Sequence, residues 1–538
     1  MTALHLADCH PIAAAPGLSR LCADYCAGDA AVRPFYGALP PHSNWQALPS
    51  LPAHRPKLAD LLAAQNSSPS AGAAIEALRA GAGVVVTGQQ VGLFGGPLFT
   101  PLKAATALAR ARQATQSGVG HVAVFWLATE DHDFAEINNV AFPTRYELRH
   151  LVYEKSPETP VPVGGVVLDE TITPLIDQAW ELLGYSDAME ALAAAYKPGR
   201  TFAQAFGDFY SKVFSAQGLL VLDAGGREFH RMGAPVLRAA LEQADELHTA
   251  LVDRNHALER AGYHAQVAVA PQSSLLFLVD ERSGARLALK RIAPNAQEPN
   301  GLWQAGREKY ATADLLGILD AAPERISPSA LLRPVFQDYL LSTSLIIGGP
   351  AEIAYFAQSA VLFERILDRI TPSEPRFSAT LIEPSIGELL RRHELTLDRV
   401  FNETADSLAQ LLAARAMPVE GKRKLAAAGN ALETDLAPLL DWMRALDPGL
   451  GRSAETAANK MRYQMNRLRR LAANYQLQRE GALKRHADAI TCSLYPGGVL
   501  QERVHGAAYY FARYGLELAE RLTEQAMEPC AGHTAIWL

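Results

Sequence analysis

The chain has 538 residues, of which 49% are hydrophobic and 20% are charged, and its net charge is −7. This composition is typical of a folded protein of more than one domain, and it excludes a disordered chain. The mildly acidic balance argues against broad nucleic-acid binding. No run approaches the ~20 apolar residues that a membrane span requires. We therefore expect neither a nucleic acid nor a membrane as a partner.

The five cysteines are too few and too unevenly placed for a disulfide framework: Cys9, Cys22, Cys26, Cys492 and Cys530. We expect reduced thiols in a cytoplasmic protein, because the start of the chain has neither the basic residues nor the apolar run of a secretory signal. Cys22 and Cys26 fit one helix face, but no Cys or His pair follows at zinc-finger spacing, so no metal site is predicted.

Residues 1–80, rich in Pro and Ala, are predicted to pack on a core that begins at residue 81. Val84–Val86 is a β-branched run typical of a buried strand, and a glycine-rich turn and a helix at Leu98–Arg112 follow it. His121–Leu127 is a second apolar run. Strand, helix and strand in this order form a βαβ unit, which builds parallel sheets.

Later elements extend this pattern. Gly218–Asp223 and Leu345–Ile347 are predicted strands, and the second leads through Gly348, Gly349 and Pro350 into a helix that reaches Ile370. Further helices are expected at 173–195, 201–217 and 231–260. Three short runs predict an antiparallel insertion: Gln266–Val269, Leu275–Val279 and Arg286–Leu289.

The character of the sequence changes after about residue 376. Ile386–Arg485 is predicted to be helical, with breaks at Met417–Pro418 and Asp447–Gly449, and it ends in a heptad seam of Met461, Met465, Leu468, Ala472 and Tyr475. The sequence therefore predicts an α/β fold: a Rossmann-like parallel-sheet core with inserted segments (81–375), a helical coiled-coil arm (376–490) in which the seam helix pairs with Lys422–Leu446, and a C-terminal segment (491–538) that returns to the core.

Three polar loops would meet at the carboxyl ends of the parallel strands, where ligands bind in open sheets: Thr87–Gly96, Glu130–Asp133 and Gly348–Glu352. In the first loop, glycine lets backbone N–H groups near Gly88 approach an anion, although no known phosphate-binding fingerprint is matched. Gln89 and Gln90 favour ligand binding over a bare turn, and Lys103 lies one helical turn further on, where it either reaches an anion or is solvated.

Glu130-Asp131-His132-Asp133 carries the most chemistry, since carboxylates and an imidazole can act as a general base, orient an amine or bind a divalent cation. Adjacent side chains diverge, so we expect His132 to act with either Asp131 or Asp133. The alternative is a helix N-cap followed by acidic first-turn residues.

Two further basic features stand out. Arg333, one turn before Gln337, can clamp a carboxylate or form a structural ion pair. The helix Lys460–Arg485 carries eight Lys or Arg against one Glu, which indicates either a solvated coiled-coil face or a phosphate pocket near Tyr495–Gly498. No G-x-S-x-G or H-E-x-x-H motif is present, which argues against an α/β-hydrolase and a zincin.

Six segments, spread in order over the chain, closely resemble the BshC family, the cysteine-adding enzymes of bacillithiol biosynthesis: TGQQVGLFGGPLFT (87–100), FWLATEDHDFAEIN (125–138), AGYHAQV (261–267), SPSALLRPVFQDYLL (327–341), GGPAEIAYFAQ (348–358) and LYPGGVLQERV (494–504). The resemblance implies a Rossmann-type core and a coiled-coil arm that mediates homodimerisation. It also implies the last step of bacillithiol synthesis, in which the carboxyl group of cysteine is joined to the amine of glucosaminyl-malate.

The resemblance further implies an adenine-nucleotide site near the coiled coil, where ADP is an expected ligand. Because a free carboxylate must be activated before it forms an amide, we expect ATP or another adenine nucleotide as cosubstrate, with Mg²⁺ as its companion ion. We assign this nucleotide to the last motif, at Tyr495, Gly497, Gln501 and Arg503. The chain carries neither H-x-G-H nor K-M-S-K-S of class I synthetases, so the activating cosubstrate is left open.

Amide formation requires that the site hold both reactants, accept the amine proton and stabilise an oxyanion. The expected catalytic residues are His132, Asp131, Asp133 and Gln90, and the expected substrate-binding residues are Gly88, Gln89, Lys103, Arg333, Gln337, Gly348, Gly349 and Glu352. Within these sets, Asp131 or His132 would be the base or would orient the amine. Gln89 and Gln90, with the N–H groups of the loop, would hold a carboxylate or oxyanion. Arg333 would neutralise the malyl carboxylates. The alternatives are another nucleotide-dependent amide ligase or transferase on the same fold, and a non-catalytic coiled-coil protein.

Overall fold

The computed structural model describes residues 8–10, 18–37, 45–46, 52–292, 302–528, 530 and 532–538. Much of the start of the chain, on which the expectation about a secretory signal rests, lies outside these ranges. The described part of the N-terminal segment contacts the core: the Tyr25 hydroxyl donates to the carbonyl of Ser373 (2.6 Å), and that of Tyr36 donates to the carbonyl of Ile353 (2.9 Å).

The core is a five-stranded sheet in the order β13-β12-β2-β3-β6, and all its strand pairs are parallel. Its strands are β2 (Gly83–Gln89), β3 (His121–Leu127), β6 (Leu220–Asp223), β12 (Thr343–Gly348) and β13 (Ser373–Pro375). This confirms the predicted Rossmann-like class. From β2 the chain proceeds to β3 and β6 on one side and then returns to β12 on the other, so the strand order reverses between β2 and β12, where ligands bind in such sheets.

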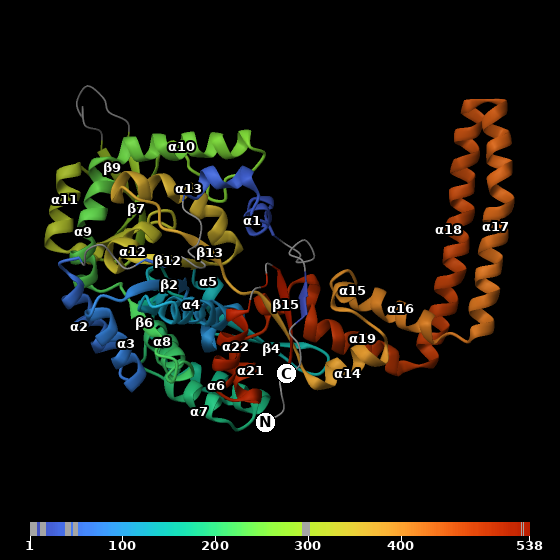
Figure 1. Cartoon of the computed structure of the whole chain (residues 1–538), viewed down its shortest axis with the longest axis horizontal. Helices are drawn as coiled ribbons and strands as arrows, with labels where there is room; N and C mark the ends of the chain where they lie inside the picture. Colours follow the sequence, from blue (N-terminus) through green and yellow to red (C-terminus); the bar gives the residue numbers. More distant parts are fainter. Residues whose placement is uncertain are drawn as a thin grey trace.

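Helices cover both faces of this sheet, which explains why its strands are apolar throughout rather than alternating (Figure 1). Val84 and Val86 face one core, and Val85 faces the other. The first core is closed by α1 (Arg20–Cys26), α2 (Arg55–Gln65), α3 (Pro69–Arg79), α9 (Arg227–Glu242), α10 (Ala244–Arg260), α11 (Thr312–Ala321), α12 (Arg333–Leu341) and α13 (Pro350–Leu367). The second is closed by α4 (Phe99–Gln116), α5 (Phe134–Ile137), α6 (Ile172–Leu183), α7 (Asp187–Ala195), α8 (Phe202–Val213), α21 (Ala507–Tyr514) and α22 (Leu518–Met527).

The predicted antiparallel insertion is present as a five-stranded sheet in the order β10-β9-β8-β7-β11. Its strands are β7 (Ser273–Val279), β8 (Arg286–Ile292), β9 (Leu302–Ala305), β10 (Glu308–Tyr310) and β11 (Ile326–Pro328). The strand expected at Gln266–Val269 is wrong, because the N–H and carbonyl of Val267 are bound by the side-chain amide of Gln358 (2.9 and 2.8 Å) instead of by a neighbouring strand.

The C-terminal part contains a small body and a projecting arm. The body is built from the sheet β1-β15-β14 (Asp8–His10, His533–Trp537, Ala379–Ile382) and five helices: α14 (Pro384–Arg392), α15 (Leu397–Phe401), α16 (Ala405–Ala416), α19 (Gly481–Leu494) and α20 (Gln501–Val504). The hairpin of β4 (Asn139–Pro143) and β5 (Leu148–Val152) packs instead on the second core of the sheet domain. The antiparallel helices α17 (Val419–Leu446) and α18 (Pro448–Arg479) extend away from the body (Figure 1), which confirms the coiled-coil arm.

Three of the five predicted seam residues lie outside the contact between α17 and α18, whereas Met465 and Ala472 are half-buried. The two helices meet through Leu432, Leu436 and Leu440 of α17 and the small Ala454 and Ala458 of α18, and small side chains let helices approach closely. The seam residues Met461, Leu468 and Tyr475 are 50%, 55% and 65% exposed in the single chain. The arm therefore presents an apolar stripe on its outside.

The cysteine prediction is wrong for one pair, because Cys9 and Cys530 form a disulfide across 521 positions of sequence. Strand β1 pairs with β15, and this pairing brings the two ends of the chain together in a way that no sequence spacing reveals. Cys22, Cys26 and Cys492 are free thiols.

The cytoplasmic location stays a prediction. Across the described ranges, no helix is both long and apolar enough to span a bilayer.

Candidate functional site

Lys103 of α4 joins the carboxyl ends of β2 and β12. Its ammonium is almost fully buried, donates to the Gly88 carbonyl (2.7 Å) and to Oε1 of Gln89 (3.0 Å), and forms an ion pair with Glu352 of α13. Glu352 also accepts the N–H of Gly349 (2.7 Å). Burial lowers the pKa of Lys103, and the charge of Glu352 opposes this shift. These five predicted residues thus lie together, but their polar groups bind largely one another.

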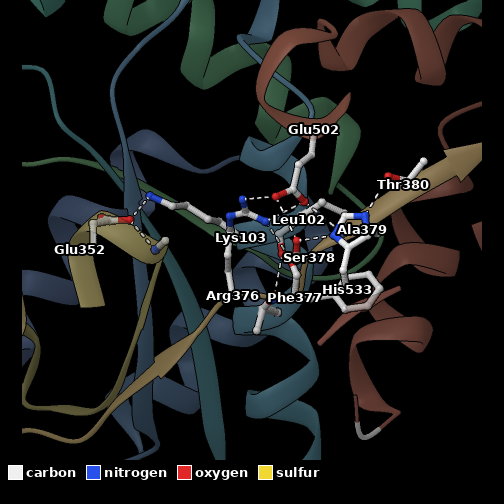
Figure 2. A network of polar contacts seen from close by, with 12 residues as sticks. Leu102, Lys103, Glu352, Arg376, Phe377, Ser378, Ala379, Thr380, Glu502 and His533 are labelled. Carbon is white, nitrogen blue, oxygen red and sulfur yellow. Dashed lines mark hydrogen bonds and ion pairs between the residues drawn. The ribbon is translucent and has the colours of Figure 1, made fainter. Parts of the chain in front are cut away.

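A second buried ion pair lies beside this cluster (Figure 2). Arg376, just after β13, binds Glu502 of α20 through both terminal nitrogens (2.9 and 2.5 Å), and Glu502 also accepts from Ser378 and from the N–H of Ala379 (both 3.0 Å). Burial alone would raise the pKa of Glu502, but Arg376 holds it below its ordinary value. His533 bonds Ser378 and Thr380 on the far side. The pair therefore fastens the C-terminal body to the sheet edge.

The loop after β3 lies at the same edge of the sheet, on the other side of β2 from β12, and forms a wall of polar side chains. Asp131 accepts from Nε2 of Gln90 and from the N–H of His132 (both 2.7 Å), and Gln90 also donates to Glu136 (2.7 Å). Both amide hydrogens of Gln90 are thus used, and only its oxygen is left to bind a ligand, so it suits an amine rather than the predicted anion. Asp133 is exposed and caps α5 by accepting the N–H of Glu136 (3.3 Å), which is the helix-cap alternative weighed above.

Two partners in this wall come from distant elements and were not predicted. His230 of α9 lies 2.8 Å from Oε1 of Glu130, and Arg286 of β8 lies 3.1 Å from Nδ1 of His132. They are 100 and 154 positions away from their partners in the sequence. No motif or spacing marks them, so only the packing of α9 and of the insertion against the sheet edge could reveal them.

Arg333, the first residue of α12, is half-buried, and its guanidinium has no hydrogen bond or ion pair with any residue that the structure describes. Its charge nevertheless helps to hold the pKa values of Glu130 and Asp131 low against the opposing effect of burial. Tyr355 of α13, also unpredicted, lies within electrostatic range of Glu352, Arg333 and Asp131, and burial raises its pKa. This edge of the sheet therefore combines an uncommitted cation with a wall of hydrogen-bond acceptors.

The remaining predicted ligands support the backbone. Gln337 is buried, and its Nε2 is 3.6 Å from the position of a Cβ on Gly88. The Gly348 carbonyl accepts the N–H of Arg376 (2.8 Å). Across the described ranges, no three His, Cys, Asp or Glu side chains gather as a set of metal ligands.

A separate cavity of about 950 Å³ lies at the base of the arm. The rings of Phe401 and Tyr495 form part of its wall with centroids 5.3 Å apart, and its charged lining residues are Glu147, Glu403 and Asp488. Of the predicted nucleotide ligands, Tyr495 and Gly497 line it.

The other two predicted nucleotide ligands lie elsewhere. Gln501 is buried and binds backbone groups of Leu381 and Ser493, and Arg503 is exposed and close enough to Lys103 to affect its pKa. The structure thus does not bring the four predicted nucleotide ligands together: Tyr495 and Gly497 line the arm cavity, Gln501 is used by the backbone, and Arg503 lies on the side of Lys103.

The parallel sheet, the polar side chains at its carboxyl ends and the projecting helical pair define a Rossmann-like protein with a coiled-coil arm. Residues 7–376 match the family model "Bacillithiol biosynthesis BshC, N-terminal Rossmann-like domain", and residues 379–538 match "Bacillithiol biosynthesis BshC, C-terminal coiled-coil domain". The chain belongs to the BshC family.

Similar curated proteins are each named "Putative cysteine ligase BshC". One from Koribacter versatilis (strain Ellin345) is 43% identical, over 98% of this chain and 99% of its own length. One from Solibacter usitatus (strain Ellin6076) is 33% identical over 90% of both chains, and one from Salinibacter ruber (strain DSM 13855 / M31) is 30% identical over 98% of this chain and 97% of its own.

Proposed function

We propose that this protein is a ligase that joins the carboxyl group of cysteine to the amine of glucosaminyl-malate, the last step of bacillithiol biosynthesis. The names of its relatives support a cysteine ligase. The observation that carries the proposal is the uncommitted guanidinium of Arg333 beside Glu130 and Asp131, since the acceptor substrate presents carboxylates and an amine to one site.

The polar side chains at this edge of the sheet suit both substrate groups. Carboxylates of the malyl unit would pair with Arg333, because a guanidinium binds a carboxylate through two hydrogen bonds. The amine would face the oxygen of Gln90 and the carboxylate of Glu130, where it is held next to the acyl donor. Lys103, engaged by Glu352 and the end of β2, would keep the two strand ends in place rather than bind substrate.

Part of the lining of the arm cavity suits an adenine nucleotide. The rings of Phe401 and Tyr495 offer an apolar surface for a base, and the carboxylates of Glu147, Glu403 and Asp488 offer acceptors for ribose hydroxyls or oxygen ligands for Mg²⁺. Phosphates would not bind these carboxylates directly, so we propose that they enter with the cation. When bound, ATP or a related nucleotide would supply the phosphate group that activates a carboxylate.

The assignment is tested with purified protein, cysteine, glucosaminyl-malate and ATP, by following the product by mass spectrometry. We expect a product with the mass of the cysteinyl amide, and release of AMP or ADP identifies the activated intermediate. Serine and alanine in place of cysteine, and glucosamine in place of glucosaminyl-malate, test the alternative of another amide ligase. No amide product with any pair would favour a non-catalytic protein.

We also propose that the chain forms a homodimer through the outside of the arm, where Met461, Leu468 and Tyr475 are exposed. Replacing Leu468 with glutamate should convert a dimer to a monomer, because it places a charge in an apolar contact. Light scattering after gel filtration measures the mass. The control Asn466→Glu changes an exposed polar residue of the same helix and should leave the dimer intact. A wild-type monomer over a wide concentration range would contradict the proposal.

A further inference from the structure

The proton positions of His132 are set by a buried arginine. Arg286 is only 4% exposed, and it donates through Nε to Ser327 (3.0 Å), through one terminal nitrogen to the Pro328 carbonyl (2.9 Å) and through the other to Nδ1 of His132 (3.1 Å). Its guanidinium also lies 3.7 Å from the ring centroid of Phe277. An arginine side chain only donates. Nδ1 of His132 is therefore the acceptor, and a neutral ring carries its single proton on Nε2.

The second histidine of the wall has the opposite pattern. His230 is fully buried, with Nε2 2.8 Å from the Glu130 carboxylate and Nδ1 3.2 Å from the carbonyl of Gly226. The Gly226 carbonyl is an acceptor and so is Glu130 when ionised, so this geometry favours a proton on each ring nitrogen of His230. Burial alone would lower its pKa, but Glu130 raises it, with a smaller contribution from Glu324.

Glu130 is correspondingly held as a carboxylate. His230, Arg286 and Arg333 together keep its pKa below the ordinary value despite burial. Oε1 is bound by His230, whereas Oε2 accepts no hydrogen bond from the described residues, and the side chain retains 13% exposure. One oxygen of the Glu130 carboxylate is thus left without a protein partner among the described residues.

We propose that Glu130 is the catalytic base, that His132 donates from Nε2 to the developing oxyanion, and that Arg286 and His230 are positioning residues that fix these two proton states. This assignment rests on the proposed ligase function for its substrates. It differs from the sequence-based prediction, in which Asp131 or His132 was the base, because Arg286 occupies the nitrogen at which His132 would accept a proton.

The chemical step balances with these groups. The nitrogen of the substrate amine forms a bond to the carbonyl carbon of an acyl group activated on phosphate, an acyl phosphate or acyl adenylate. The C–O bond to that phosphate breaks, and the phosphate leaves with the electron pair. The amine proton passes to Oε2 of Glu130, while Nε2–H of His132 binds the oxyanion before the carbonyl re-forms.

Proton positions are measured directly by two-bond ¹H–¹⁵N correlation spectra of the full-length protein labelled with ¹⁵N-histidine, at neutral pH. We expect His132 with a proton on Nε2 and none on Nδ1, and His230 with protons on both nitrogens. His132→Gln assigns the first signals. Glu130→Gln assigns the signals of His230, because it should convert that ring to the neutral form. This variant leaves the buried histidine itself in place. A proton on Nδ1 of His132, or a neutral His230 in the wild type, would overturn the proposal.

Kinetics give a second readout. Glu130→Gln should lower kcat by about 10²- to 10⁴-fold with little change in KM, whereas Glu281→Gln, at an exposed ion pair of the insertion, should leave both unchanged. Arg286→Met should populate both tautomers of His132 and lower kcat. Arg286→Lys should restore part of the preference for the Nε2–H tautomer and part of kcat. Full kcat in Glu130→Gln would overturn the base assignment. The spectra remain decisive even if no amide product forms, so failure of the ligase function and failure of this inference are distinguishable.

Discussion

Replacing Arg333 with methionine is expected to lower kcat/KM for glucosaminyl-malate by about 30- to 1000-fold, the equivalent of about 2–4 kcal/mol. The guanidinium is half-buried and has no partner among the described residues, so it is available to the substrate carboxylates, and methionine preserves much of its apolar length. Steady-state kinetics with glucosaminyl-malate and with glucosamine measure the effect. The loss should shrink for glucosamine, which has no malyl carboxylates to bind.

Arg365→Met is the matched control, because Arg365 is exposed on α13 and away from the strand ends. Its kinetics should match those of the wild type. Equal losses for both acceptors in Arg333→Met would show that Arg333 acts on the catalytic step or on the fold, and would remove its assignment as the carboxylate clamp. Circular dichroism of each variant establishes that the fold is retained.

The largest expected effect on stability comes from Glu502→Gln. This change leaves the buried Arg376 without its counter-charge, and breaking one side of a buried pair costs about 3–5 kcal/mol in the free energy of unfolding. Urea unfolding measures the difference. The control Glu520→Gln weakens the half-exposed pair with Arg112 and should cost at most about 1 kcal/mol. Equal losses in the two variants would contradict the structural role of the Arg376–Glu502 pair.

The same pair has a defined pH dependence. Because the pKa of Glu502 is lower in the folded protein than in the unfolded chain, where it is about 4.3, its contribution to stability is complete above the unfolded pKa. It is lost as the pH falls through the folded pKa. The difference in the free energy of unfolding between the wild type and Glu502→Gln should therefore shrink in acid. A difference that stays constant with pH would contradict this pH dependence.

Much of the core could be predicted because its strands have a one-dimensional signature. Val84–Val86 and His121–Leu127 are unbroken apolar runs followed by glycine or acidic residues, and parallel strands buried on both faces require such runs. The three polar loops followed from the same pattern, since the carboxyl ends of parallel strands lie on one edge. Gln90 and Asp131 do lie together there.

The partners that set the chemistry could not be predicted in the same way. His230 belongs to α9 and Arg286 to β8, and both sequences mix apolar and charged residues with no mark of a site. Gln90 lies in the predicted loop, but which of its polar groups stay free for a ligand could not be predicted, because its amide hydrogens are used by both Asp131 and Glu136. The seam of α18 was identified by its spacing, but spacing does not show which partner it faces.

The Cys9–Cys530 bond has a topological consequence. Nearly the whole polypeptide lies between its two sulfurs, so under oxidising conditions the backbone is a covalent ring that includes the arm. A protease that cuts once at the turn near Asp447, where α17 ends and α18 begins, would open this ring without dividing it. The nicked molecule should keep its full mass in denaturant and separate into two fragments only when a thiol is added.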